Sequence, residues 1–128
     1  MSQALRVLVV DDEPEVRETL QDVLGLLGHH STTAANGREA VQAVAAAVYD
    51  VVLLDNRMPG GFADEVVQKL RLHGCAATII VMTGDWTDPH VALALEAGAA
   101  AYLRKPFSLE AIQEALADLP DAEAAECA

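Results

Sequence analysis

The chain has 128 residues, of which 52 % are apolar, and its 20 acidic and 8 basic residues give a formal net charge of −12. A chain of this length is expected to form one domain with its own hydrophobic core. The charge disfavours direct binding to nucleic acid or anionic lipid. The sequence has neither an apolar run of ~18 residues nor a signal peptide. We therefore expect a cytoplasmic protein that neither spans nor binds the membrane.

The first quarter of the chain favours a strand, a helix and a second strand. Residues 5–10, LRVLVV, form an apolar, β-branched run that suits a strand buried on both faces. Pro14 fits the first turn of a helix that we expect to reach about Leu27, with Gly28 closing it. Residues 31–35, STTAA, are a weaker strand candidate.

The alternation continues through the rest of the chain. Asn36 and Glu39 resemble a capping box that opens a helix to about Ala47. Further strands are expected over residues 51–54, 78–82 and, more weakly, 100–103. Further helices are expected over residues 64–72, 89–97 and 108–119. Ser108 is the expected N-cap of the last one.

Five strands that alternate with five helices predict a doubly wound α/β domain, because right-handed crossovers produce a parallel sheet with helices on both faces. We expect residues 1–119 to form this domain. Residues 120–128 are acidic and alanine-rich, which is consistent with a frayed tail or with the start of a linker.

Polar residues follow four of the predicted strands. The first strand ends in Asp11 and Asp12, the third in Asp55 and the fourth in Thr83, and Lys105 follows the fifth. The carboxyl ends of parallel strands form the crevice in which doubly wound domains bind ligands. These side chains are therefore expected to converge on one edge of the sheet.

If the strand order is 2-1-3-4-5, Asp11, Asp12 and Asp55 crowd together at the switch point. Three adjacent carboxylates stay ionised at low cost only if a cation joins them. Oxygen ligands with room for water favour Mg²⁺ over zinc or copper. Neither the two cysteines nor the four histidines have metal-ligand spacing, so we expect no zinc site and no disulfide.

Each of these residues also has a simpler interpretation. Asp11 and Asp12 could favour the positive end of the following helix dipole, and Asp55 could be an ordinary turn residue. Thr83 could be structural and Lys105 a solvated charge. Those interpretations would have to hold together at four separate strand ends.

The set Asp11-Asp12, Asp55 with Met58-Pro59, Thr83-Gly84 and Lys105-Pro106-Phe107 resembles the receiver domain of bacterial two-component response regulators. The match in order and spacing runs from about residue 5 to residue 119. The resemblance, not the spacing, supplies the strand order 2-1-3-4-5 and the flavodoxin-like fold class.

The resemblance implies a role for each matched residue. Asp55 would be the phosphoacceptor for a phosphoryl group carried by a histidine of a sensor kinase or phosphotransfer protein. Asp12, Asp55 and the backbone carbonyl of Arg57 would hold Mg²⁺, with Asp11 acting mainly through water and electrostatics. Lys105 would pair with Asp55 at rest and with the phosphoryl group afterwards.

The resemblance also implies a switch rather than an enzyme with an external substrate. The Thr83 hydroxyl would bond the phosphoryl group, and Tyr102 would rotate inward to fill the space that Thr83 vacates. The surface of the fourth helix, fifth strand and fifth helix would then change for a downstream target or for an output domain outside this chain. Homodimerisation through the fourth and fifth helices is possible.

Three positions distinguish this chain from the common family pattern. Many members have glycine eight residues after the phosphoacceptor, where this chain has Ala63, so the intervening loop could take another path. Arg57 and Asp85 occupy positions that line the route of attacking water in the family, and they could pair with each other and slow hydrolysis.

Other classes of protein fit less well. A flavin-binding flavodoxin would meet repulsion between its phosphate and the acidic cluster, and no Walker loop supports nucleotide hydrolysis. A haloacid-dehalogenase-like phosphatase would usually carry a second aspartate where this chain has Arg57. A degenerate receiver that only docks a partner, without phosphorylation, is the remaining alternative.

Overall fold

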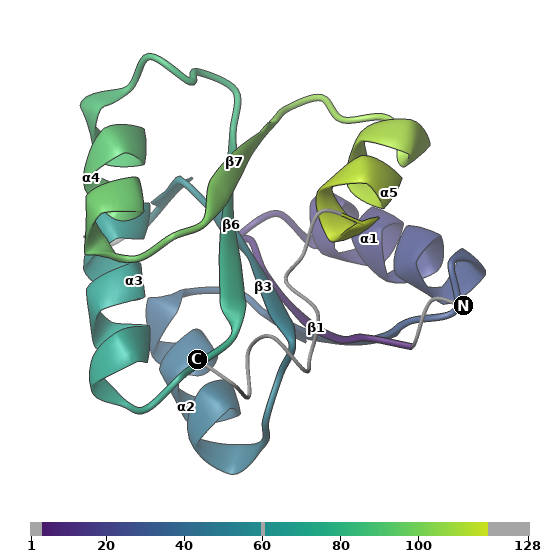
Figure 1. The fold of residues 1–128 in the computed structure, drawn as a ribbon, viewed down its shortest axis with the longest axis horizontal. Coiled ribbons are helices and arrows are strands. Elements are labelled where there is room, and N and C mark those ends of the chain that lie inside the picture. Colours follow the sequence, from purple (N-terminus) through teal and green to yellow (C-terminus); the bar gives the residue numbers. More distant parts are fainter. Residues whose placement is uncertain (1–3, 60, 118–128) are drawn as a thin grey trace.

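The computed structural model describes residues 4–59 and 61–117, and in them helices and strands alternate along the chain (Figure 1). The strands of the main sheet are β1 (Arg6–Val10), β2 (His30–Ala34), β3 (Val51–Asp55), β6 (Thr78–Thr83) and β7 (Ala101–Arg104). The helices are α1 (Pro14–Leu26), α2 (Gly37–Ala46), α3 (Ala63–Leu72), α4 (Pro89–Ala97) and α5 (Leu109–Ala117).

All neighbouring strands of the main sheet are parallel, and their order is β2-β1-β3-β6-β7. In order of appearance along the chain this is 2-1-3-4-5, so the predicted fold class and strand order are confirmed. The switch point lies between β1 and β3, where the chain leaves the centre of the sheet in opposite directions.

The helices cover both faces of the sheet, and the alternation of side chains along each strand explains why. Leu8 and Val10 of β1 belong to the core cluster that includes residues of α2, α3 and α4. Val7 and Val9 belong to the cluster that includes residues of α1 and α5. Because successive strand side chains point to opposite faces, an uninterrupted apolar strand serves both cores, and each buried valine or leucine side chain contributes about 1.5–3 kcal/mol.

Local signals place the helix ends close to their predicted positions. The Asn36 side chain accepts a hydrogen bond from the Glu39 amide at 2.9 Å, and the Glu39 carboxylate reaches back to the Ala35 amide. The Ser108 hydroxyl accepts from the Ala111 amide at 3.1 Å. These caps satisfy amides that have no partner within the helix. The predicted end of the last helix at residue 119 lies outside the described residues.

The segment after β3 differs from the prediction. The sequence predicts no strand between residues 54 and 78, but Arg57–Met58 (β4) and Gly61–Phe62 (β5) form a short antiparallel pair. Two residues per strand carry no periodicity that a sequence pattern could reveal.

Among the described helices, none is long and apolar enough to cross a membrane.

Candidate functional site

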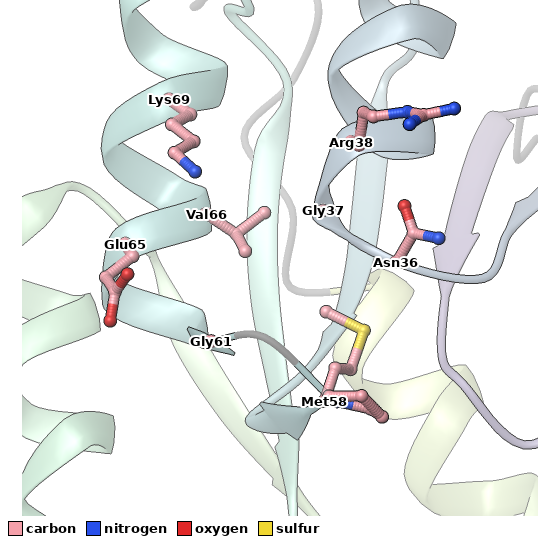
Figure 2. Close-up of a pocket in the computed structure, with 9 residues that line it drawn as sticks. Asn36, Gly37, Arg38, Met58, Gly61, Glu65, Val66 and Lys69 are labelled. Carbon is pink, nitrogen blue, oxygen red and sulfur yellow. The ribbon is translucent and has the colours of Figure 1, made fainter.

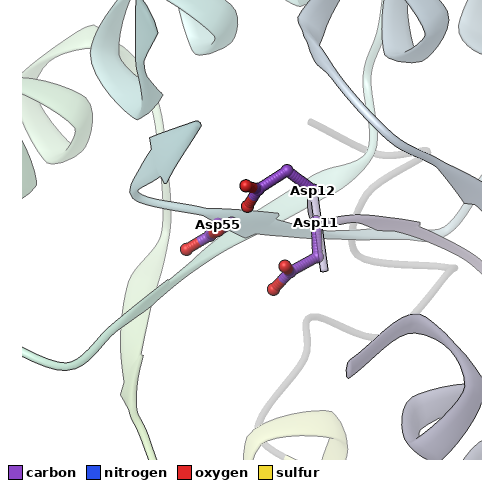
Figure 3. A group of neighbouring side chains, drawn as sticks. All are labelled: Asp11, Asp12 and Asp55. Atoms are coloured by element: carbon purple, nitrogen blue, oxygen red, sulfur yellow. The ribbon is translucent and has the colours of Figure 1, made fainter. Parts of the chain in front are cut away.

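Three carboxylates lie together where β1 and β3 end (Figure 3). Asp11 and Asp12 follow β1 directly, and Asp55 is the last residue of β3. Each residue offers a carboxylate oxygen within 4.8 Å of those of the other two. Asp11 is fully buried and Asp55 is 7 % exposed, so two of the three charges are largely shielded from water.

Asp55 was predicted to follow its strand, but it is part of it. Its backbone continues the ladder opposite Met82 of β6, because strand pairing uses only backbone groups and tolerates a carboxylate at the end. Thr83 is likewise the last residue of β6 and not the first residue beyond it. Both side chains are consequently fixed by the rigid sheet and not by a loop.

Lys105 provides the positive charge of the cluster. Its ammonium Nζ donates to Asp11 Oδ2 at 2.9 Å and to Asp55 Oδ1 at 3.2 Å. The second oxygen of the Asp11 carboxylate accepts the Glu13 amide at 2.9 Å. The ion pair of Lys105 and Asp55 that the family resemblance implies for the resting state is therefore present.

Burial controls the proton affinity of Asp55. It raises the pKa of the Asp55 carboxyl from 3.8 to about 6, against the attraction of Lys105 and with the help of the repulsion from Asp11. Burial also opposes the charge on Lys105, but the hydrogen bond to Asp11 and the attraction of Asp55 outweigh it, so the pKa of Lys105 is raised. The cluster thus holds more negative charge than one ammonium can neutralise.

Thr83 is buried at this edge, and its hydroxyl is engaged within its own loop. The hydroxyl donates to the Asp85 carbonyl at 2.9 Å and accepts the Asp85 amide at 3.0 Å. Tyr102 lies on β7 opposite Val81, and it is 41 % exposed. The Thr83 hydroxyl is therefore not bonded to the carboxylate cluster, and Tyr102 is open to solvent.

The suggested pairing of Arg57 with Asp85 is wrong. The Arg57 guanidinium instead lies 3.4 Å from Asp88 Oδ2, while Asp85 Oδ1 accepts hydrogen bonds from the amide and hydroxyl of Thr87. Asp85 is thus satisfied within its own turn, and Asp88, one residue before α4, is the nearer partner. The Arg57 side chain is 74 % exposed and does not contact the acidic cluster in the described contacts.

Sequence reasoning missed a second polar cluster beside the site. The imidazole of His90 stacks on the ring of Phe62 with their centroids 3.6 Å apart, and its Nδ1 lies 2.8 Å from Asp64 Oδ1. Asp88 caps α4 by accepting the His90 amide at 2.9 Å, and it also accepts the Asn56 side-chain amide at 3.2 Å. The sequence signal was only the pair Asp88-Pro89, which marks a helix start.

A separate hollow of about 410 Å³ lies between the beginning of α2 and α3 (Figure 2). It is lined by Asn36, Gly37, Arg38, Met58, Pro59, Gly61, Glu65, Val66 and Lys69. None of the carboxylates of the acidic cluster lines it, so the hollow is distinct from that cluster.

Comparison with known proteins agrees with this geometry. A family model described as the response regulator receiver domain matches residues 7–117. The response regulator MprA of Mycolicibacterium vanbaalenii is 41 % identical over 106 residues, which cover 83 % of this chain and 46 % of that protein. The chain thus spans less than half the length of this relative.

Solved structures give the same answer. The chemotaxis protein CheY4 of Vibrio cholerae superposes with a TM-score of 0.86 at 28 % identity, covering 92 % of this chain and 100 % of that one. The receiver domain of the sensor histidine kinase PA1611 of Pseudomonas aeruginosa, with magnesium in its active-site cleft, gives 0.80 at 28 % identity, covering 89 % and 95 %. Sequence, fold and the carboxylate cluster together place this chain in the response regulator receiver domain family.

Proposed function

We propose that this chain is a phosphorylation-activated switch of a two-component system, with Asp55 as its phosphoacceptor. The observation that supports this most directly is the meeting of three carboxylates and the Lys105 ammonium at one edge of the sheet. The phosphodonor would be a phosphohistidine on a sensor histidine kinase or phosphotransfer protein. We infer no catalysis beyond the chain's own phosphorylation and dephosphorylation.

In the transfer, a carboxylate oxygen of Asp55 attacks the phosphorus atom and forms a P–O bond as the P–N bond to the donor histidine breaks. The imidazole nitrogen keeps the electron pair of the broken bond and later takes a proton from solvent. Lys105 lies within hydrogen-bond distance of Asp55 and can shift to a phosphoryl oxygen. Because Lys105 already contacts Asp55, little reorganisation is needed.

The residues present fit Mg²⁺. Asp11, Asp12 and Asp55 offer hard oxygen ligands close together, and the carboxylates exceed the single ammonium in charge. We propose that Asp12, Asp55 and the backbone carbonyl of Arg57 hold the ion, with Asp11 acting mainly through water. When bound, Mg²⁺ neutralises charge on the phosphoryl oxygens.

We propose that Thr83 and Tyr102 carry the switch. A phosphoryl group adds a charge of about −1.5 to −2. This charge would attract the Thr83 hydroxyl away from the Asp85 carbonyl, to which it donates at 2.9 Å. Tyr102, which is now exposed, would then rotate inward and alter the surface of α4, β7 and α5.

We also propose the domain bounds, the cellular location and the partners of the chain. We expect residues 1–119 to act as a cytoplasmic receiver, and residues 120–128 to be a tail or linker. The target would be a downstream protein or an output domain, with no direct nucleic-acid or membrane binding by this domain and with homodimerisation possible. A receiver that only docks its partner is less favoured, because the sequence retains each polar residue of the family set, and Asp11, Asp12, Asp55 and Lys105 lie together.

The test combines mass and fluorescence. The wild type and Asp55→Asn are treated with acetyl phosphate, with and without Mg²⁺, and the intact proteins are weighed. We expect the wild type to gain one phosphoryl group only with Mg²⁺, and the variant to gain none. The fluorescence of Trp86, the only tryptophan, should respond to Mg²⁺ in the wild type. An unmodified wild type whose fluorescence ignores Mg²⁺ would favour the docking-only alternative.

A further inference from the structure

The cluster around Asp88 and His90 connects the segment after the phosphoacceptor to the start of α4. Asp88 Oδ1 accepts the His90 amide and so caps the helix, while Asp88 Oδ2 accepts from Asn56 at 3.2 Å and from Arg57 at 3.4 Å. Asn56 and Arg57 are the two residues that directly follow Asp55. One carboxylate thus joins the exit of β3 to the first turn of α4.

A second contact fixes the same turn from the side of α3. His90 Nδ1 lies 2.8 Å from Asp64 Oδ1, and the His90 ring stacks on Phe62 with an interplanar angle of 8°. Phe62 belongs to β5 and Asp64 to the first turn of α3. Figure 1 shows α3 and α4 side by side along this face of the sheet. The start of α4 is therefore held at two points.

The two points differ in strength. The contacts of His90 are short and partly buried, whereas the Arg57 guanidinium is 74 % exposed and its 3.4 Å contact is long. Exposed ion pairs of this kind contribute little to stability. Asn56 Oδ1 is also buried without a hydrogen-bond partner among the described residues. The Asn56 side chain, which donates to Asp88, therefore leaves one of its own polar atoms unpaired. The Asp88 contact is the one that can open.

We propose that the contact of Asp88 with Asn56 and Arg57 is a resting-state clamp on α4, and that phosphorylation of Asp55 opens it. A phosphoryl group carries up to twice the charge of a carboxylate and offers an arginine two parallel hydrogen bonds. Because Arg57 is only two residues beyond Asp55 in the chain, a phosphoryl group on Asp55 competes with Asp88 for the Arg57 guanidinium. Loss of Arg57 leaves Asp88 with the Asn56 hydrogen bond as its only tie to the segment after β3, and His90 acts as the pivot.

The clamp rests on the proposed function, because it requires a phosphoryl group on Asp55. It adds a route to α4 that runs through the residues after β3, in parallel with the route through Thr83 and Tyr102. It also predicts that α4 can be released without phosphate, by removing the Asp88 carboxylate alone.

The experiment is hydrogen exchange of α4 amides in the full chain, with and without beryllofluoride and Mg²⁺. Asp88→Ser is the informative variant, because serine caps a helix about as well as aspartate but cannot reach both partners. Asn36→Ser, which makes the matching change at the cap of α2, is the control. We expect beryllofluoride to speed exchange at the start of α4 in the wild type by about 5-fold or more.

Without beryllofluoride, Asp88→Ser should already exchange at the faster rate, and Asn36→Ser should behave as the wild type. Asp64→Asn, which weakens the pivot, should speed exchange in both states. If Asp88→Ser without ligand exchanges as slowly as the wild type, the clamp is wrong while the proposed function stands. If the wild type binds no beryllofluoride and gains no phosphoryl mass, both are wrong.

Discussion

At the scale of single residues, the main feature is a carboxylate kept at the end of a buried strand. Asp55 is 7 % exposed and close to Asp11, and burial raises the pKa of its carboxyl to about 6. The burial that raises this pKa also costs stability whenever the Asp55 carboxyl is ionised. Such a cost is measurable, because removing the charge should strengthen the fold.

We therefore expect Asp55→Asn to raise the free energy of unfolding by about 1–3 kcal/mol at pH 8 without Mg²⁺. The folded state keeps the Asp55 proton up to about pH 6, whereas the unfolded state loses it near 3.8. The cost is thus fully present above about pH 6 and disappears as the pH falls toward 3.8. The advantage of the variant should shrink over the same window in urea titrations.

Asp22→Asn, which removes one exposed acidic charge from α1, is the control for net charge. It should change stability little. A constant advantage of Asp55→Asn from pH 4 to pH 8 would mean that charge burial is not its cause.

The sequence predicted the members of the acidic site well, because strand ends and carboxylates are both visible as patterns. It did not predict the partners of Arg57 or the stack of His90 on Phe62. Those contacts join residues about thirty positions apart through side-chain orientation. No periodicity or spacing encodes them.

At the scale of elements, the joints between helices and strands are held by specific polar contacts. The Arg71 guanidinium, at the end of α3, donates to three backbone carbonyls, those of Cys75, Ala77 and Gly98. Gly98 has a φ of +126°, which a side chain rarely adopts, and it ends α4. One side chain thus secures the loop before β6 and the turn before β7.

We expect Arg71→Met to lower the free energy of unfolding by about 2 kcal/mol, because methionine keeps the apolar stem but leaves the carbonyls without this donor. Lys69→Met on the same helix is the control, since the described contacts give the Lys69 ammonium no partner. Chemical denaturation of both variants measures the difference. Equal losses would show that charge or helix propensity, and not the three hydrogen bonds, is responsible.

The order of the elements could be predicted because apolar strands and helix caps alternate clearly along the chain. Boundaries shifted by one residue, as at β2, whose sequence HSTTA has no sharp apolar edge to mark its ends. The pair β4 and β5 was missed because two-residue strands have no pattern of their own. Their pairing depends on the backbone path after Asp55.

At the scale of the whole molecule, the net charge of −12 and the acidic cluster make stability depend on cations. We expect Mg²⁺ to raise the free energy of unfolding by about 2.7 kcal/mol once its concentration reaches ~100 times the dissociation constant. Asp12→Asn should abolish most of this gain, since it removes a proposed ligand that is more open to solvent than Asp11.

General screening of the acidic surface would also stabilise the fold, and it must be separated from binding. Thermal unfolding in NaCl at matched ionic strength measures that contribution, which Asp12→Asn should share with the wild type. A gain with Mg²⁺ that NaCl reproduces in full would exclude a specific site.

The ammonium of Lys105 has a consequence for the resting state of the domain. Because it bonds both Asp11 and Asp55, the protein carries its own internal counter-ion. A bound Mg²⁺ would share these carboxylates with the Lys105 ammonium. We therefore expect the supply of cations around the folded protein, and not the folding reaction, to determine when the domain can receive a phosphoryl group.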